Sequence, residues 1–203
     1  MNSTAATSQG VPAPEVVVRG SPGLAAFLAA VRATSGCRML DLGPALPVNF
    51  AIYSTFARAV RFVDLLRGAR ELPERVKQPP ILTTEAVTKL LAGLDAPYHG
   101  ILLWDALDYL GINETRVLVE RLARCSGPGT RLFALVSATH RMSSIPLRFE
   151  ILDAERLAYR AVSSETCASP ELPPAEVERR IAPFRAERVF LLRHGVREYV
   201  GVL

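Results

Sequence analysis

Short apolar runs alternate with segments of helical periodicity along most of this chain, and this alternation is the feature that most restricts its fold. The apolar runs lie at residues 38–42, 61–65, 100–104 and 131–136. The segments with apolar residues at helical spacing lie between them, at residues 50–60, 84–94 and 113–122. Because parallel strands need a long crossover connection, usually a helix, the pattern predicts a parallel sheet with helices on both faces.

The last two apolar runs, at residues 188–192 and 198–203, are connected differently. Only a short turn at His194 and Gly195 separates them, and strands joined so closely must be antiparallel. We therefore expect an α/β fold with a doubly wound, mostly parallel sheet that ends in a C-terminal antiparallel hairpin strand. A chain of 203 residues suits one domain, which we place at residues 15–203 after a flexible tail at 1–14 rich in Ser, Thr, Ala and Pro.

Several local signals predict where elements begin. Ser21 precedes a proline and is expected to cap the first helix, while Asn49 and Asn113 are expected to cap the helices that follow them. Residues 81–82 are long enough for a very short strand. The segment 138–174 is less regular; residues 149–152 and 157–159 within it would either pair or cap the sheet, and we expect the segment to cover the mouth of a site as a lid.

Charge and cysteine usage exclude several classes of protein. The formal net charge of +4 is spread along the chain with no block of like charge, so a nucleic-acid partner is not expected. The three cysteines are far apart and form no C-x-x-C pair, so we expect neither a metal site nor disulfides, as in a cytoplasmic protein. No apolar run reaches the ~18–20 residues of a membrane span, and the N-terminus does not read as a signal peptide.

Acidic residues follow three of the predicted strands. Asp41, Asp64 and Asp105 each stand at or just after an apolar run. A single Asp at a strand end is usually a turn residue. The carboxyl ends of parallel strands meet at one edge of the sheet, however, and ligands bind there where the strand order reverses. Three such residues on one sheet therefore predict a common crevice.

The residues around these acids resemble a known family. Residues 39–43 (MLDLG) look like the first motif of the class I S-adenosylmethionine-dependent methyltransferases, and residues 63–65 (VDL) are similar to the acidic end of their second strand. Residues 102–110 (LLWDALDYL) resemble their fourth strand and the turn after it. The terminal reversed strand is a further mark of that Rossmann-like fold. The resemblance covers roughly residues 22–203, with 66–83 and 138–174 matched poorly.

The resemblance implies S-adenosylmethionine as the cofactor and assigns roles to individual residues. Asp41 and Gly43 would shape the floor under its methionine part, and Asp64 would accept hydrogen bonds from the ribose hydroxyls. Trp104 and Asp105 would lie near the amino-acid end of the cofactor and the substrate entrance. The acceptor, a small molecule or a protein, is not indicated, nor is the oligomeric state.

The loop after the first motif departs from the family pattern. Ala45 and Pro47 stand where the second and third glycines are usual, and Pro44 and Pro47 lack backbone donors. Amide donors matter most for a pyrophosphate, so the loop argues against NAD more strongly than against S-adenosylmethionine. Two hypotheses stay open: a methyltransferase, and a non-catalytic relative in which a side chain such as Leu46 fills the adenosine volume.

Methyl transfer to a protonated acceptor is helped by a general base. Asp105 and His140 are the candidates, and an exposed loop position is the alternative for His140. Tyr53 and Tyr109 would either orient a substrate or pack in the core. A further group of residues in the segment 138–174 would either meet an anionic acceptor or serve solubility, namely Arg141, Arg148 and Arg156.

Overall fold

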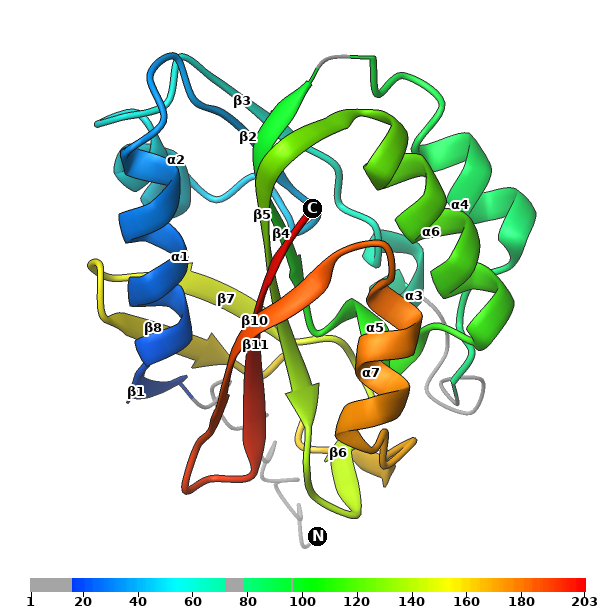
Figure 1. Ribbon diagram of the computed structural model, residues 1–203. Coiled ribbons are helices and arrows are strands. Elements are labelled where there is room, and N and C mark those ends of the chain that lie inside the picture. The colour runs from blue at the N-terminus through cyan, green and yellow to red at the C-terminus, as the bar shows by residue number, and fades with distance from the viewer. Residues whose placement is uncertain (1–15, 72–78, 96) are drawn as a thin grey trace, which may run out of the picture.

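The structure is a computed structural model that describes residues 16–71, 79–95 and 97–203. The tail predicted at residues 1–14 lies outside the described residues. The described part contains a six-stranded sheet in the order β10-β11-β5-β4-β2-β3 (Figure 1). In that order, the strands are β10 (Arg185–Leu191), β11 (Val196–Val202), β5 (Ser126–Ser137), β4 (Tyr98–Trp104), β2 (Arg38–Asp41) and β3 (Ala59–Phe62).

Strand directions agree with the sequence prediction. The pairs β2–β3, β2–β4 and β4–β5 are parallel, whereas β11 is antiparallel to both β5 and β10. The strand β2 lies between β3 and β4, so the chain extends the sheet in one direction after β2 and in the other direction from β4 onward. The carboxyl ends of β2 and β4 therefore flank the point where the strand order reverses, which is the usual ligand position in such sheets.

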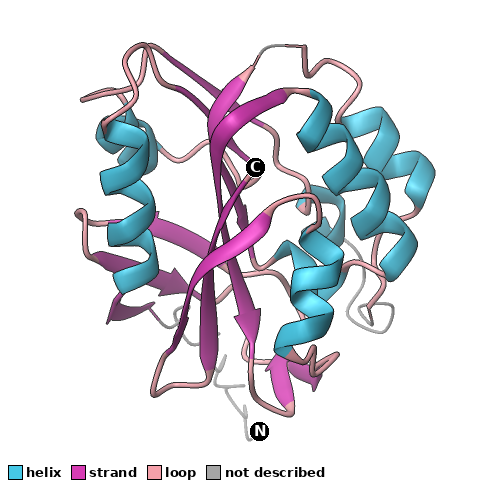
Figure 2. Cartoon of the chain, in the orientation of Figure 1, coloured by secondary structure: helices cyan, strands magenta, loops and turns pink. Residues whose placement is uncertain are grey.

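Helices cover both faces of the sheet (Figures 1 and 2). On one face lie α1 (Pro22–Arg32) and α2 (Pro47–Tyr53). On the other face lie α3 (Arg67–Glu71), α4 (Thr84–Leu90), α5 (Ala106–Tyr109), α6 (Ile112–Arg124) and α7 (Pro174–Ile181). Each face of the sheet buries its own cluster of apolar side chains, and the two clusters form the core.

The segment 138–174 is more regular than predicted. It supplies β7 (Arg148–Ile151) and β8 (Arg156–Arg160), which join β1 (Val16–Gly20) in a separate antiparallel sheet in the order β1-β8-β7. It also supplies the antiparallel pair β6 (Arg141–Ser143) and β9 (Thr166–Ala168). The small sheet packs under α1 and α2 at the carboxyl edge of the central sheet (Figure 1).

The first helix begins as predicted, with help from the far end of the chain. The Ser21 hydroxyl oxygen accepts a hydrogen bond from the Leu24 amide at 3.4 Å. The same hydroxyl donates to Glu198 of β11 at 2.5 Å, and the Gly23 amide donates to the second Glu198 oxygen at 2.6 Å. A buried acid thus satisfies free amides at the start of α1, where negative charge is favourable.

Other local predictions were wrong. Asn49 lies inside α2, and its side chain bonds to the backbone of β7. The helix α6 begins after Gly111, so Asn113 lies within its first turn. Residues 81–82 form no strand; the Ile81 amide donates to the carbonyl of Tyr109 instead. The cap prediction for Asn49 was wrong because its buried contact with β7 outweighs a local cap. The cap prediction for Asn113 was wrong because Gly111 already supplies the extended backbone that a helix start needs.

Candidate functional site

Asp41 lies at the carboxyl end of β2 and is completely buried. Three groups of the protein donate to its carboxylate: the Gly43 amide at 2.8 Å, the Tyr53 hydroxyl at 2.8 Å and the Trp104 indole N–H at 2.5 Å. Burial raises the pKa of Asp41 to about 6, against the lowering effect of these donors. The three hydrogen bonds engage both carboxylate oxygens of Asp41 within the protein.

Trp104 ends β4 in an unusual backbone conformation. Its φ of 53° lies in the left-handed region, which a bulky residue rarely adopts and which occurs preferentially at functional sites. Its indole lies against Gly43: a Cβ added at Gly43 would lie 2.8 Å from the indole nitrogen. On its other side the indole stacks on Phe149 of β7, with ring centroids 5.2 Å apart. The small residue at position 43 therefore makes room for Trp104.

Asp64 follows β3 at the same edge of the sheet, and it is ion-paired with Arg70 of α3. The Arg70 side chain is 9% exposed and that of Asp64 is 25% exposed, so the guanidinium is nearly buried while the carboxylate keeps some contact with solvent. The strand end that was predicted to carry a free acid thus carries a half-buried salt bridge.

Little space is left between these residues. The hollow lined by Gly43, Arg70 and Trp104 at the reversal point has a volume of about 10 Å³, which is about enough for one water molecule. The structure therefore brings the predicted residues Asp41, Gly43 and Trp104 together, but it fills the space among them with their own side chains.

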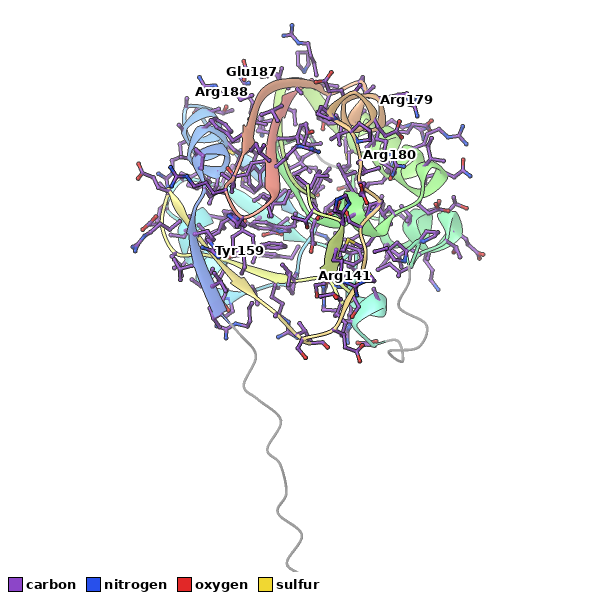
Figure 3. All side chains as sticks on the ribbon, turned by 90° about the horizontal axis from the view of Figure 1, so that it is seen from below. Arg141, Tyr159, Arg179, Arg180, Glu187 and Arg188 are labelled. Atoms are coloured by element: carbon purple, nitrogen blue, oxygen red, sulfur yellow. The ribbon has the colours of Figure 1, made fainter. Side chains whose placement is uncertain are left out.

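A larger cavity, of about 170 Å³, lies directly beside this closed hollow. Asp105, Leu147 and Phe149 line both spaces, so they form the wall between them. The remaining walls come from β5, α5, β6, β8 and the turn between β10 and β11. Tyr159 of β8 and Arg141 of β6, which both line the cavity, are labelled in Figure 3. Residues of the segment 138–174 thus line the cavity, and its role as a lid stays a prediction.

Two buried carboxyls of the α5 turn face this cavity. Asp105 accepts a hydrogen bond from the Leu147 amide at 3.1 Å, and Asp108 accepts one from the Ser137 amide at 2.9 Å. Burial raises the pKa of Asp105 to about 7, and burial, assisted by the neighbouring charge of Asp105, raises the pKa of Asp108 to about 8. Groups with pKa values near neutrality can hold or release a proton, so this pair has the properties of acid–base residues.

The other predicted site residues lie elsewhere or are engaged. The His140 side chain is 89% exposed and pairs with Glu171 at 2.8 Å, outside the cavity lining. Tyr53 is used by Asp41, and the Tyr109 hydroxyl, at the cavity wall, donates to the carbonyl of Ser143. Of the three arginines, only Arg141 lines the cavity, while Arg148 and Arg156 do not.

Sequence reasoning missed three residues of the cavity. Asp108 stands three positions after Asp105, a spacing that places both on one side of a helical turn, and this signal could have found it. Tyr159 and His194 come from segments 35 positions apart, and no local pattern connects them.

Comparison with solved structures identifies the architecture. The glycopeptide N-methyltransferase MtfA complexed with S-adenosyl-L-homocysteine superposes with a TM-score of 0.50 at 13% identity, over 97% of this chain and 90% of that one. Magnesium protoporphyrin IX methyltransferase (ChlM) from Synechocystis PCC 6803 with bound SAH gives 0.50 at 14% identity, over 89% and 80%. The chain has the class I methyltransferase fold. No protein-family model matches the sequence, and no curated protein does.

The described residues contain neither a candidate metal site nor a helix suited to a membrane span. No group of three or more His, Cys, Asp or Glu side chains in the described part of the chain could hold a metal ion. Within the same residues, no helix has both the length and the apolar character needed to cross a membrane.

Proposed function

We propose that this chain is an S-adenosylmethionine-dependent methyltransferase that acts on an unidentified small-molecule or protein acceptor. The observation that carries the proposal is the adjacency of the two spaces. The reversal point with Asp41 and Gly43 shares the wall of Asp105, Leu147 and Phe149 with an open cavity. Methyl transfer needs two ligands aligned side by side away from water, and this arrangement offers neighbouring positions for them.

The cofactor position is closed in the arrangement described above. An adenosyl group is far larger than about 10 Å³, and the indole of Trp104 occupies the cradle at Gly43. Arg70 takes the carboxylate of Asp64, which would otherwise accept hydrogen bonds from ribose hydroxyls. The residues fit the cofactor only after both side chains move aside. The proposal therefore includes a displacement of Trp104 and Arg70 on binding.

Titration calorimetry with S-adenosylmethionine and S-adenosylhomocysteine tests the proposal directly. Trp104 is the single tryptophan of the chain, so its fluorescence reports displacement of the indole. We expect binding with a change in Trp104 emission, and Asp64→Ala should weaken it by roughly 1–3 kcal/mol, the cost of unpaired hydrogen-bonding groups. Asp153→Asn, a change at a carboxyl that is absent from the lining of either space, is the matched control. No heat at millimolar ligand would overturn the proposal.

The closure favours a second candidate, a non-catalytic ligand-binding relative. Here Trp104, rather than the Leu46 predicted from sequence, would be the permanent filling of the cofactor position. The variant Trp104→Ala separates the two. If the chain is a methyltransferase, the wild type binds the cofactor. If it is the non-catalytic relative, the wild type does not bind the cofactor, although the hollow is open in Trp104→Ala.

A further inference from the structure

Three residues that line the cavity beside the reversal point each carry a buried polar atom that the described part of the protein leaves unpaired. Among the described residues, Asp108 Oδ1, the Tyr159 hydroxyl and His194 Nε2 are buried and have no hydrogen-bond partner, and all three residues line the cavity. Asp108 is 5% exposed and Tyr159 is 8% exposed. Buried polar groups in proteins are nearly always satisfied, so three orphans around one cavity indicate a missing partner.

These atoms favour a ligand that donates hydrogen bonds. The carboxyl of Asp108, whose pKa burial raises to about 8, keeps its proton at neutral pH, but a bound ammonium group stabilises the ionised form, whose free oxygen accepts. A tyrosine hydroxyl can accept, and a neutral imidazole carries one accepting nitrogen. Burial lowers the pKa of His194, so its ring stays neutral at physiological pH. Arg141 also lines the cavity, but its guanidinium donates to Thr166 of β9.

The charges around the cavity are of both signs: Arg19 and Glu198 act on Tyr159, and Arg19 also acts on His194. The charges acting on the two buried acids are those of Arg70, Arg180 and the acids themselves. Both guanidiniums are already engaged, Arg70 with Asp64 and Arg180 with Glu176. Among the described residues of the cavity wall, Asp108 is thus the carboxyl that has a buried oxygen without a partner.

The rest of the wall is mainly apolar and aromatic. Phe149 packs edge to face with Tyr159 at 5.3 Å, and Tyr159 does the same with His194 at 5.5 Å. Leu135 and Val136 of β5 add apolar lining, and a few small polar side chains also line the cavity, namely Ser137, Thr139 and Ser143. A cavity of about 150 Å³ is known to hold one benzene molecule, so about 170 Å³ suits a body of about one ring. Aromatic faces in addition attract cations.

We propose that this cavity binds a compact amine, with an apolar body of about one ring and with N–H groups that donate to Asp108 and Tyr159. The inference does not require methyl transfer: the amine binds whether or not the neighbouring position accepts a cofactor. If the chain is a methyltransferase, an amine held here lies on the acceptor side of the wall formed by Asp105 and Phe149.

Three one-ring probes of similar size and different charge test the inference without any adenosyl ligand: benzylamine, benzyl alcohol and benzoate. Binding is followed by the emission of Trp104, which stacks on the cavity residue Phe149. At pH 8, near the pKa of Asp108, we expect benzylamine to bind at least tenfold more tightly than benzyl alcohol, and benzoate not to bind.

Variants assign the preference to particular atoms. Asp108→Asn should remove the preference for the amine, because its amide nitrogen replaces an acceptor with a donor. Tyr159→Phe breaks no hydrogen bond to the described residues, so it should fold normally and weaken benzylamine several-fold. Asp153→Asn, outside the cavity, should leave the affinity unchanged.

Equal affinity for the three probes, or an unchanged preference in both Asp108→Asn and Tyr159→Phe, would overturn the inference. Failure of the proposed function is seen separately, since it is the absence of cofactor binding in wild type. Asp108→Asn should still bind S-adenosylhomocysteine if that proposal is right, because Asp108 does not line the hollow at Gly43.

Discussion

Replacing Asp108 by Asn should stabilise this protein, and the gain should depend on pH. The carboxyl is buried beside Asp105, and burial raises its pKa from the ordinary value of 3.8 to about 8. At neutral pH the folded protein therefore keeps a proton on Asp108 that the unfolded chain releases. The Asn side chain has nearly the same shape and can still accept a hydrogen bond from the Ser137 amide, but it does not ionise.

The magnitude follows from the two pKa values. When folding raises the pKa of a group, the folded protein loses stability as the pH rises from the unfolded to the folded pKa of that group. The loss is about 1.4 kcal/mol per pH unit. Between 3.8 and pH 7 this amounts to roughly 4 kcal/mol for Asp108. Relaxation of the site and access of water to the cavity reduce the loss, so we expect Asp108→Asn to be about 2–4 kcal/mol more stable at pH 7 and about equal below pH 4.

Urea unfolding at pH 4, 5.5, 7 and 8, followed by the emission of Trp104, measures this difference. Asp153→Asn is the control: its carboxyl is exposed and its pKa is lowered, first by the Glu155 amide and then by Arg156, so its removal should not stabilise the protein at any pH. A stability difference for Asp108→Asn that is constant across the pH range, or a loss at pH 7, would refute the reasoning.

Two further substitutions test the packing that places the site. Gly43→Ala puts a Cβ 2.8 Å from the indole nitrogen of Trp104 and 3.1 Å from an Asp41 oxygen, so we expect a loss of about 1–3 kcal/mol with shifted Trp104 emission; unchanged stability and emission would show that the indole does not rest on Gly43. Asn49→Ala leaves a carbonyl and an amide of β7 without their partner, which should cost about 1–3 kcal/mol in urea unfolding; a change below about 0.5 kcal/mol would contradict the contact.

The sequence by itself determined the alternation of strands and helices in the central sheet, the final hairpin, and the edge of the sheet at which Asp41 and Asp105 stand. These features follow from local periodicity and from a topological rule, because the carboxyl ends of parallel strands meet at one edge. The helix caps were less predictable. Ser21 was correctly identified, whereas Asn49 was not, because its amide satisfies backbone groups about 100 positions away.

Only the tertiary structure decided whether that edge is open or closed. The indole of Trp104 reaches an Asp41 oxygen 63 positions away, and Arg70 forms an ion pair with Asp64. The neighbouring cavity likewise depends on Tyr159, from a strand outside the central sheet. Which side chain fills a hollow is set by rotamers and by contacts between distant segments, and hydrophobic periodicity carries no information about either.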